Sequence, residues 1–526
     1  MPAPTVLSST ERLQLPVRPV WVDAARAVAD VVPLMRFRAS SLRGRRSRRT
    51  AAVGMASIVV CTFASGWLPA YLPGAGGDGR AGEILELLPV GFMGVLLVAT
   101  VSAVTSAGGR ELLPREQAVA FPVSAATDHL GALLMAPLNI AWLVQSWLVL
   151  GATAYTVGAA RGLALSQLPV LLWLGVTTAV AQALAWVVEW VRRGPHGAWA
   201  VKAAGLAAML TVALAIGAGG VVGRLDALPT GHVGRAVMYG AHGDLLGWLE
   251  VVAALVVTGA LAVVLGALVA QRVAHRPACD EMRSETSTRT PAANPATGFG
   301  ALVRTDRVGI WRSVPLRRGL GVLVTLPALA AVTGDLEWEM LTIMPGLVAS
   351  GGALLFGVNS WCLDGRGALW RESLPVPPAV VFGSRVAVLV EVLVLATSVT
   401  LVLACVRAGL PTLSELVAVL CSTVVVSVQV VATSLRWSVR HPFAVDLRSA
   451  RATPAPPLVM VGNSTRLAVS TTLVALLFTL TAAHGSGWSV LLACPFLLLS
   501  ALKLVRTSRD WARPATRSRV VTSVAS

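Results

Sequence analysis

The stretch LLGWLEVVAALVVTGALAVVLGALVA at residues 245–270 decides the fold class of this chain. Its apolar residues form one uninterrupted block, broken only by the charge of Glu250, and do not alternate in an amphipathic period. A helix of this length, rising about 1.5 Å per residue, crosses the hydrocarbon core of a bilayer, which is roughly 30 Å thick. The stretch therefore predicts a transmembrane helix.

Blocks of the same kind recur along the chain and predict twelve membrane-spanning helices in all. The others lie near residues 51–71, 84–106, 131–156, 163–188, 203–222, 320–333, 340–360, 379–404, 413–434, 467–483 and 487–502. Of the 526 residues, 55% are hydrophobic and only 13% are charged, whereas a soluble domain is about a quarter charged. Backbone polar groups in lipid must be satisfied within the segment, so each block is expected to be helical. The sequence predicts an all-α polytopic membrane protein.

The basic residues indicate the orientation of these helices. The chain has 43 lysines and arginines against 26 acidic residues, a net charge of +17. The basic residues gather in residues 1–50, in alternate loops and in the tail from 503. Basic residues beside membrane segments mark the cytoplasmic side. We therefore expect a multi-pass protein of the cytoplasmic membrane with both termini inside. Because the charge follows the loops, it predicts attraction to anionic membrane lipid and no nucleic-acid partner.

An internal repeat divides the chain into two halves. The ends of the fourth and tenth blocks share four residue types at an offset of 247 positions: Gln182, Trp190, Arg193 and Pro195 against Gln429, Trp437, Arg440 and Pro442. Six helices per half is an even number, so the two halves share one orientation and form parallel repeats. The predicted organisation is a basic cytoplasmic tail (1–50), a first six-helix half (51–270), a cytoplasmic linker (271–319), a second six-helix half (320–502) and a basic cytoplasmic tail (503–526).

Residues 20–38, in the N-terminal tail, carry apolar residues at helical spacing with charges opposite. This pattern predicts an amphipathic helix lying in the membrane interface. The alternative is a loose basic tail, because Pro33 interrupts the pattern.

Several kinds of chemistry are missing from the sequence. A P-loop needs a lysine preceded by glycine, and neither Lys202 nor Lys503 fulfils that condition, so the chain has no P-loop ATP site. The six cysteines form no CxxC pair and the seven histidines no ligand cluster, so no metal site is predicted. We expect no catalytic residues and no cofactor in this chain, which is predicted not to be an enzyme.

Polar side chains within the predicted helices are candidates for a substrate path: Asn139, Gln182, Glu391 and Gln429. Burying a charge at the centre of a bilayer costs about 3 kcal/mol or more, which makes Glu391 the most informative of them. The alternative is that these residues form interhelical hydrogen bonds that fix packing, each contributing about 0.6 kcal/mol.

The loops resemble those of ABC exporter permeases of the second type, membrane subunits that work with a separate ATPase. The resemblance lies in residues 359–367 (NSWCLDGRG) followed by 374–378 (LPVPP), and in the first-half counterparts 108–111 (GGRE) and 121–124 (FPVS). Residues 228–231 (LPTG) are similar to the outer segment before the last helix of that family. Most such permeases have one six-helix set and dimerise, whereas two sets are joined here.

The resemblance implies that segments 108–124 and 363–378 are coupling helices that dock onto two copies of an ATP-binding cassette subunit. ATP and magnesium would then be bound by those partners. Residues 20–38 would be the connecting helix on the inner leaflet. The implied coupling residues are Arg110, Glu111, Arg115, Glu116, Pro122, Asp364, Gly365, Arg366, Arg371, Glu372 and Pro375.

Three classes of function remain open from the sequence. The leading hypothesis is the complete membrane part of an ATP-driven exporter, whose mostly apolar path suits an amphiphilic or drug-like substrate. The alternative is an ion-gradient-driven secondary transporter of major facilitator type, with Glu391 as its proton-coupling acid. The third is a membrane scaffold or sensor that transports nothing.

Overall fold

The structure of this chain is a computed structural model, and its described residues form helices joined by turns, without a strand. The described residues are 20–40, 45–105, 123–138, 140–159, 162–197, 199–201, 203–205, 207, 230–276, 293, 295–333, 336–357, 359–365, 367–444 and 457–525.

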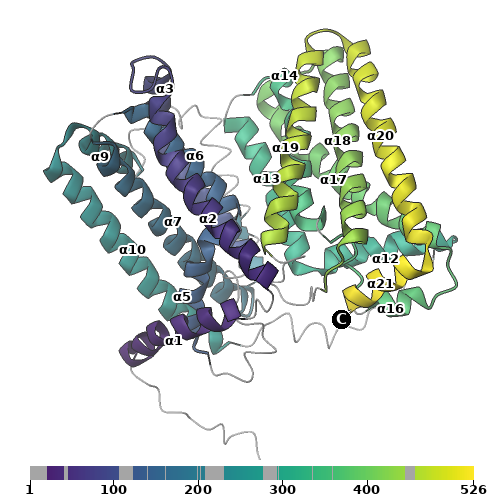
Figure 1. The fold of residues 1–526 in the computed structure, drawn as a ribbon, viewed down its shortest axis with the longest axis horizontal. Helices are drawn as coiled ribbons and strands as arrows, with labels where there is room; N and C mark the ends of the chain where they lie inside the picture. Colours follow the sequence, from purple (N-terminus) through teal and green to yellow (C-terminus); the bar gives the residue numbers. More distant parts are fainter. Residues whose placement is uncertain are drawn as a thin grey trace, which may run out of the picture.

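Two helical bundles lie side by side, one from each half of the sequence (Figure 1). The first contains α1 (Val20–Ser40), α2 (Arg45–Trp67), η1 (Leu68–Tyr71), α3 (Arg80–Thr105), α5 (Ala125–Met135), η2 (Ala136–Leu138), α6 (Ile140–Val157), α7 (Leu163–Arg192), α9 (Gly231–His242) and α10 (Leu245–Ala274). The second contains α12 (Gly298–Arg312), α13 (Val314–Thr333), α14 (Trp338–Leu341), α15 (Met344–Gly352), the π-helical turn η4 (Ala353–Gly357), α16 (Gly367–Glu372), α17 (Pro378–Ala408), α18 (Leu413–Arg440), α19 (Pro457–Ala482), α20 (Ser486–Ala512) and α21 (Pro514–Ala525). Direct contact between the bundles includes α3 against α13.

Six of the helices in the described part are long and apolar enough to cross a membrane: α3, α7, α10, α17, α18 and α20. The chain is thus an all-α protein with membrane-spanning helices. Two further apolar helical stretches, Met55–Tyr71 and Arg466–Ala482, are shorter. The predicted block at 203–222 lies largely outside the described residues.

Two of the predicted blocks are broken helices. The block at 131–156 turns through η2, which contains Pro137, between α5 and α6. The block at 340–360 is divided into α14, α15 and η4, and Pro345 stands in the first turn of α15. A proline lacks the N–H that would continue the preceding helix, which explains why these apolar runs do not form single straight rods.

The two bundles use the same packing scheme. α7 packs against α10 as α18 packs against α20, and α2 packs against α6 as α13 packs against α17. α3 lies against both α6 and α7, and α15 lies correspondingly against α17 and α18. The pairs of helices that correspond in sequence therefore also correspond in their contacts.

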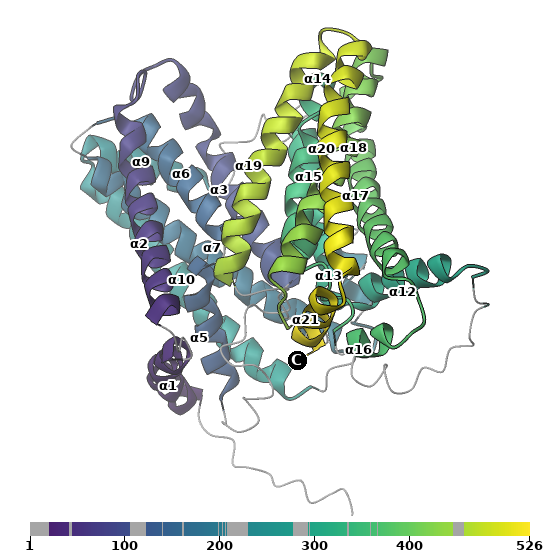
Figure 2. The same cartoon turned by 45° about the vertical axis from the view of Figure 1, so that its right-hand side comes forward.

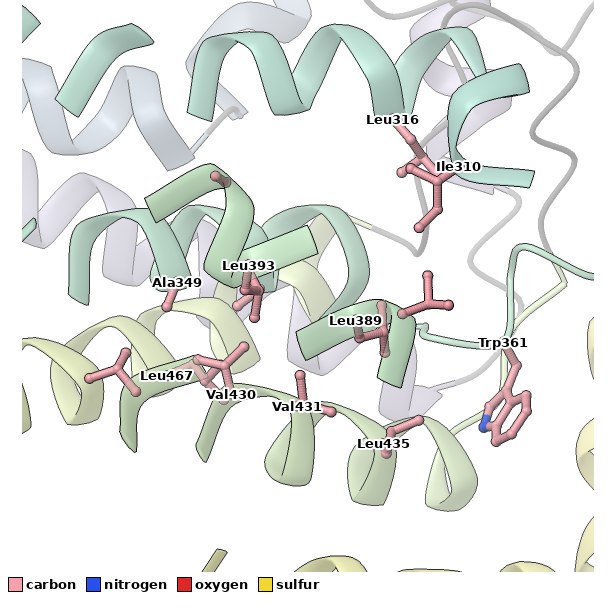
Figure 3. Close-up of a cluster of buried hydrophobic side chains, with 14 of the residues drawn as sticks. Ile310, Leu316, Ala349, Trp361, Leu389, Leu393, Val430, Val431, Leu435 and Leu467 are labelled. Atoms are coloured by element: carbon pink, nitrogen blue, oxygen red, sulfur yellow. The ribbon is translucent and has the colours of Figure 1, made fainter. Parts of the chain in front are cut away.

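Each bundle has its own apolar core. In the first, Phe92, Val170 and Val237 from α3, α7 and α9 are fully buried together. The core of the second is larger and extends from the long helices into α12, α16 and α21. Figure 3 shows Ile310 of α12 close to Leu316 of α13, with Trp361 at the edge of this core.

Helices α1, α12, α16 and α21 lie at the same end of the molecule as the C-terminus (Figures 1 and 2). α12 runs across the direction of the long helices rather than along it (Figure 2). The range 271–319, expected to be a linker, thus contains α12 and the beginning of α13, and the tail from 503 contains the end of α20 and the whole of α21.

A close approach of backbones fixes α9 against α7, and substitution tests it. A Cβ built on Gly240 would lie 2.8 Å from the backbone carbon of Leu165, whereas one on Gly234 would meet only Pro89 at 3.6 Å. We expect Gly240→Ala to lower the stability of the protein by about 1–3 kcal/mol, because rigid backbone must shift. Thermal unfolding in mild detergent measures the effect. Gly234→Ala on the same helix is the control, and equal melting temperatures for the two variants would contradict this packing.

Candidate functional site

Of the two predicted coupling segments, 363–378 is described except for residue 366, and together with residues 359–362, which lead into it from η4, it forms the segment 359–378. The side chain of Asn359 donates to the carbonyl of Phe443 at 2.7 Å, and the backbone N–H of Ser360 donates to the hydroxyl of Ser438 at 2.8 Å. These bonds fasten the start of the segment to the end of α18. Gly365 then adopts a φ of +47°, a left-handed conformation that glycine accepts without strain, and α16 follows directly.

Four charged side chains meet beneath this segment: Asp306 of α12, Asp364, Arg371 of α16 and Arg385 of α17. Arg371 Nη1 lies 2.7 Å from Asp306 Oδ1 and 2.8 Å from Asp364 Oδ1. Arg385 Nη2 lies 2.7 Å from Asp364 Oδ2 and 3.3 Å from Asp306 Oδ1. Each arginine therefore bridges both carboxylates, and we call these four residues the charge cluster.

The charge cluster is deeply buried and electrically balanced. The side chains of Arg385 and Asp306 are 0% and 2% exposed. Burial by itself would lower the pKa of Arg371, but the charge of Asp364 and the hydrogen bonds and charge of Asp306 outweigh it, so the pKa lies above its ordinary value. Arg385 also donates to the carbonyl of Ser360 at 3.1 Å. Two positive and two negative groups in alternation allow all four charges to remain out of water.

Aromatic and aliphatic side chains close over the charge cluster. Trp361 stacks on Trp511 with 4.0 Å between ring centroids and 4° between ring planes, and the guanidinium of Arg385 lies 5.2 Å from the Trp361 ring. The hollow between α16 and α21 is lined by both tryptophans, by Asp364 and Arg371 and by the apolar face of α21: Val520, Val521 and Val524. An ion pair between Arg517 and Glu372 joins α21 to the end of α16.

The outer face of the segment is apolar and open. Leu369 and Trp370 are 56% and 68% exposed, and Pro375 is exposed after them. The segment thus combines a rigid, ion-paired base with an accessible apolar face, the arrangement expected of a preformed docking surface. We call Leu369 and Trp370 the exposed pair.

The structure divides the predicted coupling residues into several groups. Asp364 and Arg371 belong to the charge cluster, Glu372 pairs with Arg517, Gly365 forms the turn, and Pro375 is exposed. The following predicted residues lie outside the described residues: Arg110, Glu111, Arg115, Glu116, Pro122 and Arg366.

Sequence reasoning did not single out Asp306, Trp361, Trp511 or α21. One signal was present, since Arg385 is a lone arginine within an apolar block and a buried charge needs a partner. A second signal was the pattern around Asp306. Leu302, Val303 and Ile310 share one helical face with this acid, which indicates that the face is buried.

The residues predicted to line a substrate path lie in separate surroundings. Gln182 is buried on α7, and Gln429 of α18 donates to Ser470 of α19 at 3.5 Å. Glu391 of α17 pairs with Arg307 of α12 at 2.7 Å and keeps 42% of its side chain exposed. Asn139 lies outside the described residues. These contacts place Gln182 in the first bundle and Gln429 and Glu391 at different helix pairs of the second.

Comparisons of the chain with protein-family models, with curated proteins and with solved structures find no match. Within the described part, no group of three or more His, Cys, Asp or Glu residues could hold a metal ion. The class of the protein therefore follows from fold and composition: it is an all-α membrane protein with an ion-paired, apolar-faced segment at one end.

The charge cluster makes a prediction about stability. Asp306→Asn removes one of the two carboxylates and leaves Arg371 and Arg385 close together with half of their compensating charge. We expect the free energy of unfolding to fall by about 3–5 kcal/mol, the usual cost of breaking a buried ion pair from one side. Denaturant unfolding in mild detergent measures it.

The matched control is Asp510→Asn, which breaks the exposed ion pair with Arg513 at the end of α20. Its expected effect is about 0–1 kcal/mol, because water solvates both exposed groups. If the two substitutions lowered stability equally, the cluster would not be a buried unit.

Cys362, next to Trp361, makes a prediction about reactivity. Burial raises the pKa of its thiol to about 12, and although Arg385 partly opposes this shift, Asp364 adds to it. Since only the thiolate reacts and an ordinary thiol has a pKa of 9.0, the folded protein at pH 8 holds about a thousandfold less thiolate. In a variant that keeps Cys362 as its only cysteine, maleimide labelling between pH 7 and 9 should be negligible until denaturant is added. Rapid labelling of the folded protein would show that the segment opens.

Proposed function

We propose that this chain is the membrane-spanning permease subunit of an ATP-driven ABC exporter. Two parallel six-helix halves make twelve transmembrane helices in the cytoplasmic membrane, with both termini inside. Two copies of a separate ATP-binding cassette subunit bind ATP and magnesium and dock at the end where α16 lies. The substrate is an amphiphilic or drug-like molecule, since the helices offer few charged side chains to a polar one.

The observation that carries this proposal is the structure of the segment 359–378, which joins an ion-paired base to an exposed apolar face. A docking surface that transmits force needs a rigid base and an accessible contact face. The charge cluster supplies the base, because it ties the segment to α12 and α17 through ion pairs of 2.7–2.8 Å. The exposed pair, Leu369 and Trp370, supplies the face. Large apolar side chains that remain exposed on a well-anchored helix favour a protein partner.

The matching packing of the two bundles supports the same proposal. α7 with α10 and α18 with α20 form equivalent pairs, as do α2 with α6 and α13 with α17. Two equivalent sets of membrane helices in one chain are what two identical ATP-binding subunits would require, one for each half.

The environment of Glu391 distinguishes the exporter from the ion-gradient-driven alternative. An ion pair between two helices gives an acid a packing role that requires no transported ion. Arg307 lies 2.7 Å from Glu391, on a helix that crosses the end of the bundle. This contact favours a structural role for Glu391 over proton coupling.

The exposed pair makes the functional prediction. Co-expression of the chain with a candidate ATP-binding subunit should give a complex whose ATPase rate exceeds that of the subunit alone. Trp370→Ala together with Leu369→Ala should weaken association by a factor of about 10–100, since truncating a central apolar contact of an interface costs about 1–3 kcal/mol. Co-purification and ATP hydrolysis in proteoliposomes measure it.

The control is Trp488→Ala, which removes a tryptophan of similar exposure, 60%, from the N-terminal end of α20, remote in sequence from the docking segment. Unchanged association in both variants would refute docking at the exposed pair. Substrate movement driven by a pH gradient without any ATP-binding subunit would refute the exporter itself and favour the secondary transporter.

A further inference from the structure

α12 has two faces of different character. The face toward the protein carries Leu302, Val303, Asp306 and Ile310, each less than a tenth exposed. The face away from it carries Val308 and Trp311, which are 39% and 54% exposed. Large apolar side chains on the free face of a short, otherwise charged helix would be unfavourable in water.

Arginines surround this exposed apolar face. Arg307 and Arg312 are exposed on α12 itself, and Arg317 is exposed on the first turn of α13. Arg317 donates to the carbonyl of Trp311 at 3.3 Å, which brings its guanidinium to the end of α12 beside the tryptophan. We call Trp311, Arg312 and Arg317 the anchor group.

The position of α12 places this group at a membrane surface. Ser313 alone separates α12 from α13, whose sequence continues into an apolar run, so the anchor group stands where the chain enters the bilayer. α12 crosses the direction of the long helices, as a helix lying in the interface would (Figure 2). Tryptophan is enriched at this depth, and arginine beside it meets the phosphates of the leaflet.

We propose that α12 is an interfacial helix whose anchor group binds anionic phospholipid headgroups of the inner leaflet. Val308 and Trp311 insert among the upper acyl segments, while Arg312 and Arg317 bind the headgroup phosphate and its net negative charge. This inference rests on α12 lying against a membrane and is independent of ATP-driven export, so either proposal can fail without the other.

The test uses the full chain in lipid nanodiscs with an environment-sensitive NBD fluorophore at position 308, in a Val308→Cys variant without its natural cysteines. Nitroxide-labelled phosphatidylglycerol or phosphatidylcholine is added in increasing mole fraction, and quenching reports which lipid lies beside α12. We expect phosphatidylglycerol to quench at a severalfold lower mole fraction. The double variant Arg312→Gln and Arg317→Gln should lose that severalfold preference, because both arginines contribute to it.

Two further variants make the result specific. Arg506→Gln with Arg509→Gln removes two exposed arginines from the end of α20 and should keep the preference. Arg312→Lys with Arg317→Lys should also keep it, which separates loss of charge from loss of fold. Absence of quenching by either lipid, equal quenching by both in the parent chain, or equal loss in the two glutamine variants would each overturn the proposal.

Discussion

The charge cluster is the interaction on which the end of the second bundle that carries α12, α16 and α21 depends. Removing a charged side chain from water costs several kcal/mol, so none of its four members could be buried alone. Asp306, Asp364, Arg371 and Arg385 come from α12, the segment before α16, α16 itself and α17. These elements therefore have to assemble together, and the position of the exposed pair is set by the same contacts that place α12 against α17.

The two halves share a framework but differ where they end. Arg193, at the end of α7, donates to the carbonyls of Val273 and Arg276 and so joins α7 to α10. At the corresponding end of α18, a hydrogen bond comes from α21, where Arg519 donates to the carbonyl of Val439. Apolar helix packing depends on the long apolar segments that both halves carry, whereas these hydrogen bonds depend on single residues. A repeat can thus preserve the bundle while the ends of its two halves diverge.

The sequence predicts the long helices well because mean hydropathy over a membrane-length window reflects one dominant physical effect, the transfer of apolar side chains into lipid. It is less informative about Pro137 and Pro345, where averaging over an apolar block hides the break that a proline imposes. α12 was missed because its charged and apolar residues cancel in such an average, although they separate onto two faces in space. In the charge cluster, Asp306 pairs with Arg371, which is 65 positions further along the chain. A local sequence pattern cannot predict which acid pairs with an isolated arginine such as Arg385.

α12 connects the two surfaces for which functions are proposed. Asp306 of α12 belongs to the charge cluster, and the next residue, Arg307, pairs with Glu391 of α17. The helix is joined to α13 through Ser313 alone, so little chain separates the two elements. If a partner moves the exposed pair, α12 and α17 have to follow, because staying in place would separate buried ion pairs at a cost of several kcal/mol. Under the two proposals, a push on the docking segment would therefore be delivered to the membrane helices, and a lipid bound to the opposite face of α12 would resist or assist the same movement.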